Sequence, residues 1–197
     1  MTASFAARAL PPEMPQFAPS VWRAICAGIL HVCGWRLAGE LPNQARLVLI
    51  AAPHSSWWDG VWGLLFKVAL GADISFMAKR ELFRGPLGWI LRRLGGIPIE
   101  RNATHGLVEQ MIERFAAHER FWLGIAPEGT RRSVGRWKTG FWQIAHSARV
   151  PILPVYFDYP SKTIGIGPLF VHGLSIEADL AALRDFYRPF RGKHHNA

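Results

Sequence analysis

The sequence predicts an α/β fold in which a single domain holds a largely parallel or mixed sheet flanked by helices. Apolar runs of strand length alternate with helical patterns of about 10–15 residues, the arrangement that builds parallel sheets. The 197 residues suffice for one well-buried domain, and a composition of 50% hydrophobic and 19% charged residues excludes a disordered chain. No internal repeat, low-complexity block or linker divides the sequence.

The N-terminal region divides into a lead and a helix. Residues 1–19 contain four prolines and are expected to form a flexible lead. Residues 20–37 are expected to form an amphipathic helix, with Ser20 as its N-cap. Its apolar face carries Trp22, Ile25, Ile29 and Cys33. The 12-residue apolar stretch 24–35 is shorter than a membrane span of about 18 residues, so this helix either packs on the domain or lies in a membrane interface.

The first half of the domain is predicted to contain three strands and two helices. The strands are 47–52, 74–78 and 97–99, and the helices are 59–70 and 86–95. The first strand is continuously apolar, as in a strand buried on both faces. Gly71 closes the first helix, while Pro86 and the Gly95-Gly96 pair bound the second. Pro98 removes a ladder hydrogen bond and favours a short or outer strand.

The second half continues the alternation. The predicted helices are 104–115, 141–147 and 175–183, and the strands are 121–126, 150–157 and a glycine-rich strand pair within 162–172. Thr104 and Ser175 are candidate N-caps, and Pro127 ends the strand before it. One face of the first helix carries Leu107, Met111, Ile112 and Phe115.

Charge and cysteine content limit the partners and the compartment. There are 23 Lys and Arg against 14 Asp and Glu, a net charge of +9, which favours nucleic acid, acidic membrane or phosphorylated substrates. Cys26 and Cys33 are too few for a disulfide framework and have no second pair for zinc. A reducing, cytosol-facing location is the simplest interpretation.

The first polar cluster follows the predicted strand 47–52 and runs Pro53-His54-Ser55-Ser56-Trp57-Trp58-Asp59. If Asp59 opens the next helix, its carboxylate can meet the His54 imidazole, fix the tautomer and leave the other nitrogen as a general base. The alternative is a capping Asp59 beside a bystander His54. The spacing alone does not decide between them.

Two further loops place cations at predicted strand ends. One runs Ala126-Pro127-Glu128-Gly129-Thr130-Arg131-Arg132-Ser133, with Arg136 and Lys138 close behind, and the other ends at Arg101. Glycine lets the backbone approach a ligand, and arginine offers paired donors to phosphate. These cations form either an anion site or a solvated surface.

In this order, the loops resemble the glycerolipid acyltransferase family, typified by 1-acylglycerol-3-phosphate acyltransferases. The resemblance covers about residues 45–160. Its blocks are H-x4-D at 54–59, a G-x-I-x-x-x-R-like segment at 95–101, a P-E-G-T-R-S-like segment at 127–133 and V-P-I-x-P-V at 150–155. The segment 77–83 also looks like the family. P-E-G-T-R after a strand is quite specific, and its combination with H-x4-D is strong.

The resemblance implies a glycerol-phosphate acyltransferase-like fold, with residues 38–197 as the acyltransferase domain. His54 would take the proton from an acceptor hydroxyl that attacks an acyl thioester, and Asp59 would orient the imidazole. Glu128 fits a substrate-binding or loop-organising role better than that of a second base. The substrate-binding residues would be Lys79, Arg101, Glu128, Gly129, Thr130, Arg131 and Lys138. No cofactor and no metal are expected.

The implied reaction moves a fatty acyl group from acyl-CoA or acyl carrier protein to a lysophosphatidic-acid-like acceptor in phospholipid synthesis. An anionic membrane surface is a further expected partner, and nucleic acid is not, since no nucleic-acid motif is visible. The expected location is peripheral or monotopic on the cytoplasmic face of the inner membrane. The alternatives are another lyso-lipid or an ornithine-type lipid as acceptor, or a non-catalytic basic module that binds membrane or nucleic acid.

Overall fold

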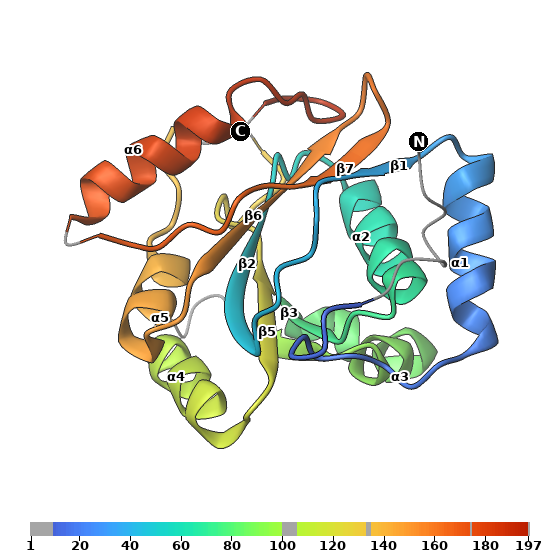
Figure 1. Cartoon of the computed structure of the whole chain (residues 1–197), viewed down its shortest axis with the longest axis horizontal. Coiled ribbons are helices and arrows are strands. Elements are labelled where there is room, and N and C mark those ends of the chain that lie inside the picture. The colour runs from blue at the N-terminus through green and yellow to red at the C-terminus, as the bar shows by residue number, and fades with distance from the viewer. Residues whose placement is uncertain (1–9, 100–105, 133–134, 174, 197) are drawn as a thin grey trace.

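The computed structural model describes residues 10–99, 106–132, 135–173 and 175–196. In this part of the chain, helices cover both faces of a seven-stranded sheet, which confirms the predicted α/β fold (Figure 1). The strands are β1 (Arg36–Ala38), β2 (Arg46–Ala52), β3 (Ile74–Lys79), β4 (Gly96–Ile99), β5 (Phe121–Ile125), β6 (Ile152–Asp158) and β7 (Thr163–Ile166). Their order across the sheet is β1-β7-β6-β2-β5-β3-β4.

The five strands from β6 to β4 are parallel, so their carboxyl ends meet at one end of the sheet. β2 is the middle strand of the whole sheet, paired with β5 and β6. β7 runs antiparallel to β6 and pairs in parallel with β1, which makes the sheet mixed. β4 is an outer strand, as Pro98 predicts. Ligand-binding loops of open α/β sheets collect at the carboxyl end of the strands, and the candidate residues follow this rule.

The helices form two layers (Figure 1). On one side lie α1 (Val21–Val32), α2 (Trp57–Leu70) and α3 (Gly85–Arg93), and on the other α4 (Leu107–Ala117), α5 (Gly140–Ala148) and α6 (Ile176–Tyr187). A 3-10 turn, η2 (Arg80–Phe83), joins β3 to α3. Successive residues of β2 serve opposite cores: Leu47 and Leu49 pack toward α1 and α2, while Val48 and Ile50 pack toward α4, α5 and α6. The unbroken apolar run of β2 is explained by this double coverage.

Two expectations about the outer strands are wrong. The helix predicted over 20–37 ends at Val32, and Arg36–Ala38 forms β1, which sequence patterning missed. The glycine-rich segment 162–172 is not a strand pair: β7 pairs with β6 and β1, and Phe170 makes only an isolated bridge to Ile152. The three residues of β1 carry too little periodicity to be read, and its partner β7 is distant in sequence.

The other predicted helices and strands appear within a few residues of their expected limits. Ser175 caps α6, since its hydroxyl accepts the Ala178 N–H at 3.4 Å. The predicted cap Thr104 lies outside the described residues, and α4 begins at Leu107 after Gly106.

The lead is packed where the structure describes it, contrary to the expectation of a flexible segment over 1–19. Residues 1–9 lie outside the described residues. Met14 is fully buried in the core of α1 and α2. The Phe17 N–H donates to Gly71 O at 2.9 Å, and the Asp73 N–H donates to Pro15 O at 2.9 Å. These bonds fix the lead to the α2–β3 turn.

A buried lysine ties this turn to the end of α3. The Lys67 ammonium donates to the carbonyls of Ile74 and Leu94, and lies 4.8 Å from the centre of the Phe17 ring. Burial lowers the pKa of Lys67 to about 8, against a small opposing effect of Asp73. The folded state therefore holds this proton less tightly than the unfolded chain.

We expect Lys67 to make stability rise with pH. Between pH 8 and about 10.4, the unfolded chain keeps the Lys67 proton and the folded state loses it, so the free energy of unfolding gains up to about 1.4 kcal/mol per pH unit from this group. Urea unfolding at pH 8 and pH 9.5 measures the effect, with Lys67→Met as the comparison. The difference between the two proteins should change with pH in favour of the wild type. A constant difference would exclude this role for Lys67.

Candidate active site

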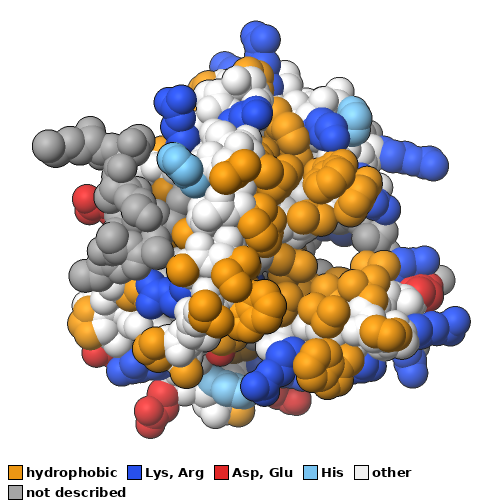
Figure 2. Space-filling model, turned by 90° about the vertical axis from the view of Figure 1, so that its right-hand side faces the viewer, with side chains coloured by type: hydrophobic (Ala, Val, Ile, Leu, Met, Phe, Trp, Pro, Cys, Tyr) orange, Lys and Arg blue, Asp and Glu red, His pale blue; other side chains and the backbone are white. Residues whose placement is uncertain are grey.

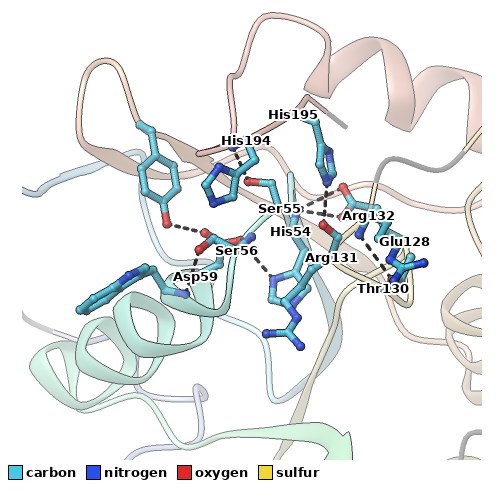
Figure 3. Close-up of polar contacts among 12 residues, drawn as sticks. His54, Ser55, Ser56, Asp59, Glu128, Thr130, Arg131, Arg132, His194 and His195 are labelled. Atoms are coloured by element: carbon cyan, nitrogen blue, oxygen red, sulfur yellow. Dashed lines mark hydrogen bonds and ion pairs between the residues drawn. The ribbon is translucent and has the colours of Figure 1, made fainter.

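The loops that carry the predicted site residues meet at the carboxyl end of the sheet (Figure 3). His54 follows β2, Glu128 to Arg131 follow β5, and Lys79 ends β3. Tyr159 follows β6 and reaches the same place. The parallel pairing of β2 with β5 and β6 produces this convergence.

Asp59 caps α2 and also faces His54, so the capping contact does not prevent the approach to the imidazole. The Ser56 hydroxyl accepts the Trp58 N–H at 3.3 Å, and the Ser56 N–H donates to Asp59 Oδ2 at 2.7 Å, completing a capping box. The same Oδ2 lies 3.4 Å from His54 Nδ1. The carboxylate has no exposed surface and lies at a helix N-terminus, where the helix dipole favours its charge.

The geometry around His54 suits a general base. Its Nδ1 faces Asp59 at a distance longer than a good hydrogen bond, as is common in catalytic pairs without substrate. The imidazole keeps 26% of its surface exposed. Nδ1 is the nitrogen that faces the carboxylate, so Nε2 is the one that a general base of this kind would use.

Tyr159 completes the support of Asp59, and sequence reasoning missed it. Its hydroxyl donates to Asp59 Oδ1, and its ring packs edge-on against Trp35 with centres 5.2 Å apart. Burial and the Asp59 carboxylate raise the pKa of Tyr159 well above its usual range, so the hydroxyl stays a donor. With Oδ1 held by Tyr159, Oδ2 is left for His54 and Ser56. No motif marks this tyrosine, which lies 100 residues beyond Asp59.

Tyr159→Phe should weaken catalysis through Asp59. If half of the about 1.5–3 kcal/mol of a charged hydrogen bond appears in the barrier, kcat falls about four- to twelve-fold. The carboxylate loses a donor and attracts a protonated His54 more strongly, so the acidic limb of the pH–rate profile moves to higher pH. Tyr156→Phe, which removes the hydroxyl of a tyrosine within β6, is the matched control. A slower Tyr159→Phe enzyme with an unmoved profile would argue for a packing role alone.

Glu128 joins the two motif loops. Its carboxylate oxygens accept the His54 backbone N–H at 2.9 and 3.1 Å, and the residue is 3% exposed. Burial raises the pKa of this carboxyl, and the His54 N–H opposes the rise. Of the two roles predicted for Glu128, these contacts support the loop-organising one.

The P-E-G-T-R loop turns sharply at Gly129. Gly129 has φ +65°, and a Cβ there would lie 2.8 Å from the Lys138 side chain, which runs across the turn. The Lys138 N–H donates to Pro127 O at 2.8 Å. The Thr130 hydroxyl accepts the Arg132 N–H at 3.4 Å. The loop thus leaves the Arg131 side chain exposed near His54.

The remaining predicted cations differ in their placement. Lys79 lies at the carboxyl end of the sheet, two strands from β2, and pairs with Glu81 at 3.0 Å. Arg101 lies outside the described residues. An open hollow of about 350 Å³ beside His54 is lined by Ser55, Ser56, Trp57, Thr130, Arg131, Arg132 and His194. Hydroxyls and cations predominate in this lining, which suits an anionic group.

Three tryptophans continue from this hollow along α2. Trp57 stacks on Trp58 with ring centres 4.5 Å apart, and Trp58 stacks on Trp62 at 5.7 Å. Trp57 is largely exposed, whereas Trp62 packs against the core of α1 and α2. The row therefore leads from the site surface to the core.

His194 and His195 also reach the site, although they belong to none of the sequence motifs. His195 Nε2 lies 3.0 Å from Arg131 O, and the His194 N–H donates to the Ser55 hydroxyl at 3.2 Å. Burial acts to lower the pKa of His195, but its bonds to the Asn196 and Arg131 carbonyls and the charge of Glu128 raise it overall. No local pattern signals these contacts.

A family model described as Acyltransferase matches residues 37–158. The match spans more than half of the chain and includes the H-x4-D and P-E-G-T-R loops at the carboxyl end of the sheet. The chain therefore belongs to the Acyltransferase family, as its motifs predicted.

Several named acyltransferases are similar to this chain. It is 33% identical over 129 residues to the 1-acyl-sn-glycerol-3-phosphate acyltransferase of Streptococcus pneumoniae, covering 64% of this chain and 47% of that protein. It is 34% identical over 123 residues to the human 1-acyl-sn-glycerol-3-phosphate acyltransferase beta, covering 59% and 43%. The Pseudomonas aeruginosa 1-acyl-sn-glycerol-3-phosphate acyltransferase is 29% identical over 122 residues, covering 59% and 45%. The chain spans about half the length of the curated relatives it matches.

The fold has a counterpart among solved structures. The crystal structure of the 1-acyl-sn-glycerophosphate (LPA) acyltransferase PlsC from Thermotoga maritima aligns with a TM-score of 0.61 at 21% identity. The alignment covers 84% of this chain and 74% of that one. At this identity the likeness concerns the fold, and it supports the expected glycerol-phosphate acyltransferase-like architecture.

Proposed function

We propose that this protein transfers a fatty acyl group from a thioester, acyl-CoA or acyl carrier protein, to the hydroxyl of a 1-acylglycerol-3-phosphate-like acceptor. The observation that carries the proposal is the His54–Asp59 pair, open to solvent on one side and next to the cationic P-E-G-T-R loop. The names of the similar proteins support the same acceptor class.

His54 acts as the base in this reaction. With Nδ1–H directed at Asp59, Nε2 accepts the proton of the acceptor hydroxyl as its oxygen attacks the thioester carbonyl. The C–S bond breaks as the carbonyl re-forms, and the leaving thiolate takes the proton from the imidazolium. The acceptor supplies the nucleophile, so no serine or cysteine of the chain is acylated.

Arg131 holds the acceptor phosphate in this proposal. Its guanidinium offers paired donors at the hollow that Ser55, Ser56 and Thr130 line with hydroxyls. A phosphate there lies beside His54, so the neighbouring hydroxyl of the same acceptor reaches Nε2. Lys79, Arg101 and Lys138 remain proposed contributors to the same positive field.

An acceptor panel tests the proposal. Labelled acyl-CoA is supplied with lysophosphatidic acid, with lysophospholipids that carry larger headgroups, and with monoacylglycerol, which lacks the phosphate. Lysophosphatidic acid should give the highest kcat/KM and monoacylglycerol the lowest. Transfer to every acceptor except lysophosphatidic acid would reject the proposed acceptor and retain acyl transfer.

We also propose that the protein docks on an anionic membrane surface through one apolar face. α1 buries Cys26, Ala27 and Leu30 and leaves its opposite side exposed. The apolar face comprises Val21, Trp22, Ile25, Ile29 and Val32 of α1 with Leu82, Leu87, Trp89 and Ile90 of η2 and α3. Figure 2 shows apolar side chains gathered on this side of the molecule, with Lys and Arg around them. Among the described residues, no helix has the length and apolarity needed to cross a bilayer.

The exposure of this face supports the interfacial alternative for the N-terminal helix. Trp22 is 62% exposed and Trp89 69% exposed, which is unusual for tryptophan in a soluble domain. Arg84, Arg92 and Arg93 are exposed beside them and suit anionic headgroups. Such a surface would present the site to lipid substrates on the cytoplasmic side of the inner membrane.

Removing both tryptophans should weaken membrane binding. Each buried aromatic side chain contributes about 1.5–3 kcal/mol, so Trp22→Ser with Trp89→Ser should lower partition onto anionic liposomes at least ten-fold. Val171→Ser, an exposed apolar residue outside the apolar face, is the matched control. Sedimentation with liposomes at low and high salt measures both contributions, since salt screens only the charge. Equal sedimentation of all three proteins would place the membrane contact elsewhere.

A further inference from the structure

The segment 190–196 crosses the carboxyl end of the sheet and closes one side of the hollow. Phe190 anchors its start by stacking on Tyr156, with ring centres 3.5 Å apart. The Arg191 N–H donates to Asp158 Oδ1 at 3.0 Å, and Arg191 O accepts the Tyr159 N–H at 2.9 Å. A bridge between Arg191 and Asn196 then folds the segment back on itself. We call residues 191–196 the C-terminal hairpin.

Both motif loops contact the C-terminal hairpin. His194 N–H donates to the Ser55 hydroxyl, which belongs to the H-x4-D loop, and His195 Nε2 bonds Arg131 O, which belongs to the P-E-G-T-R loop. The Lys193 ammonium lies 5.3 Å from the centre of the Trp58 ring. Figure 3 shows His194 and His195 above the loops that carry His54 and Arg131.

The approach to Ser55 is close enough to need glycine. A Cβ on Gly192 would lie 2.2 Å from His195 O, 2.6 Å from the Ser55 hydroxyl and 3.1 Å from Pro53 Cβ. Two of these neighbours belong to the H-x4-D loop, and the nearest is backbone of the hairpin itself. A side chain at this position must therefore displace the C-terminal hairpin.

We propose that the C-terminal hairpin is a wall of the anion site beside His54, and that His194 helps to bind a phosphate group of a substrate there. This rests on the proposed function for the identity of the substrates. The phosphate belongs either to the lyso-lipid acceptor or to the coenzyme A part of the donor. Both present the same oxygen acceptors to the imidazole and to Arg131.

The packing indicates that the C-terminal hairpin borders the anion site and does not block access to His54. With the C-terminal hairpin in place, His54 keeps 26% of its surface exposed, so the hairpin does not seal the base. The hollow of about 350 Å³ lies between the hairpin and the two loops, and His194 lines it with Arg131 and Ser56. Lys193, whose ammonium lies over the Trp58 ring, adds a positive charge to the same hairpin.

The test is a binding titration that needs no turnover. The probes are coenzyme A and 1-hexanoylglycerol 3-phosphate, with 1-hexanoylglycerol as the probe without phosphate. Gly192→Ala displaces the hairpin, and His194→Ala removes only an exposed side chain and preserves the backbone contacts. Gly135→Ala is the matched control, because a Cβ there meets nothing within 4 Å.

We expect both hairpin variants to bind one of the two phosphorylated probes about ten-fold more weakly, as for a lost hydrogen bond to a charged group. Their affinity for 1-hexanoylglycerol should not change, and the Gly135→Ala protein should bind every probe as the wild type does. A selective loss of the hexanoyl probe assigns the phosphate to the acceptor, and a selective loss of coenzyme A assigns it to the donor. Wild-type affinity for both probes in a folded His194→Ala protein would overturn the proposal, as would tighter binding in Gly192→Ala. If the wild-type protein bound the phosphorylated probes but transferred no acyl group, the proposed function would be rejected, and the proposal for the C-terminal hairpin would stand.

Discussion

His54→Ala should lower kcat for acyl transfer by about 10²–10⁴-fold, the range over which a positioned general base contributes. The substitution removes Nε2, which accepts the acceptor proton, and leaves the capping box of Ser56 and Asp59 in place. The Glu128 contact is made to the backbone N–H of residue 54 and survives the change. A discontinuous assay with labelled acyl-CoA and lysophosphatidic acid measures the loss.

Two further variants serve as comparisons for His54→Ala. His118→Ala removes an exposed histidine near the start of β5, at the opposite end of the sheet, and should be fully active. Asp59→Asn should retain more activity than His54→Ala, because the base remains and only its orientation and charge stabilisation are weakened. A folded His54→Ala enzyme with wild-type kcat would remove His54 from the mechanism.

Arg131→Lys should lower kcat/KM for lysophosphatidic acid by about 10- to 150-fold, which corresponds to about 1.5–3 kcal/mol for a lost charged hydrogen bond. Lysine keeps the charge but lacks the planar pair of donors that matches phosphate. Hydrolysis of acyl-CoA without acceptor should change much less, since it does not use the acceptor phosphate.

The control for this variant is Arg120→Lys, an exposed arginine beyond the site that lies 3.8 Å from Glu13. Steady-state kinetics with lysophosphatidic acid and with monoacylglycerol separate the effects, because only the first carries phosphate. If Arg131→Lys left kcat/KM unaltered for every phosphorylated lyso-lipid, Arg131 would hold the loop rather than the substrate. The acceptor would then belong to lipids without a terminal phosphate.

The central part of the fold could be predicted from local pattern because its strands are buried on both faces. The apolar run of β2 and the glycine that closes α2 are signals within a few residues. β1 lacks such a signal, since it has only three residues and is defined by its pairing with β7, more than a hundred residues away. The packed lead was also missed, because proline content predicts an extended backbone but not what Met14 contacts.

The candidate site likewise contains some residues that sequence motifs predict and others that no local pattern indicates. His54, Asp59 and the P-E-G-T-R loop lie within short motifs that follow predicted strands, and their convergence follows from parallel pairing. Tyr159 and His194 reach the site by hydrogen bonds from distant parts of the chain, for which a single sequence carries no spacing rule. The sequence motif also names Glu128, but only the structure shows that its carboxylate accepts the His54 backbone N–H.

A rapid-quench single-turnover experiment tests the central claim most directly. Enzyme in excess over labelled acyl-CoA is mixed with lysophosphatidic acid, and the label is followed in protein, diacylated product and free acid. We predict that the wild-type enzyme passes the label to phosphatidic acid in one phase and that no label becomes attached to protein. His54→Ala should suppress this phase. Label that accumulates on the protein before product forms, or a phase that persists in His54→Ala, would contradict direct attack by an acceptor hydroxyl activated by His54.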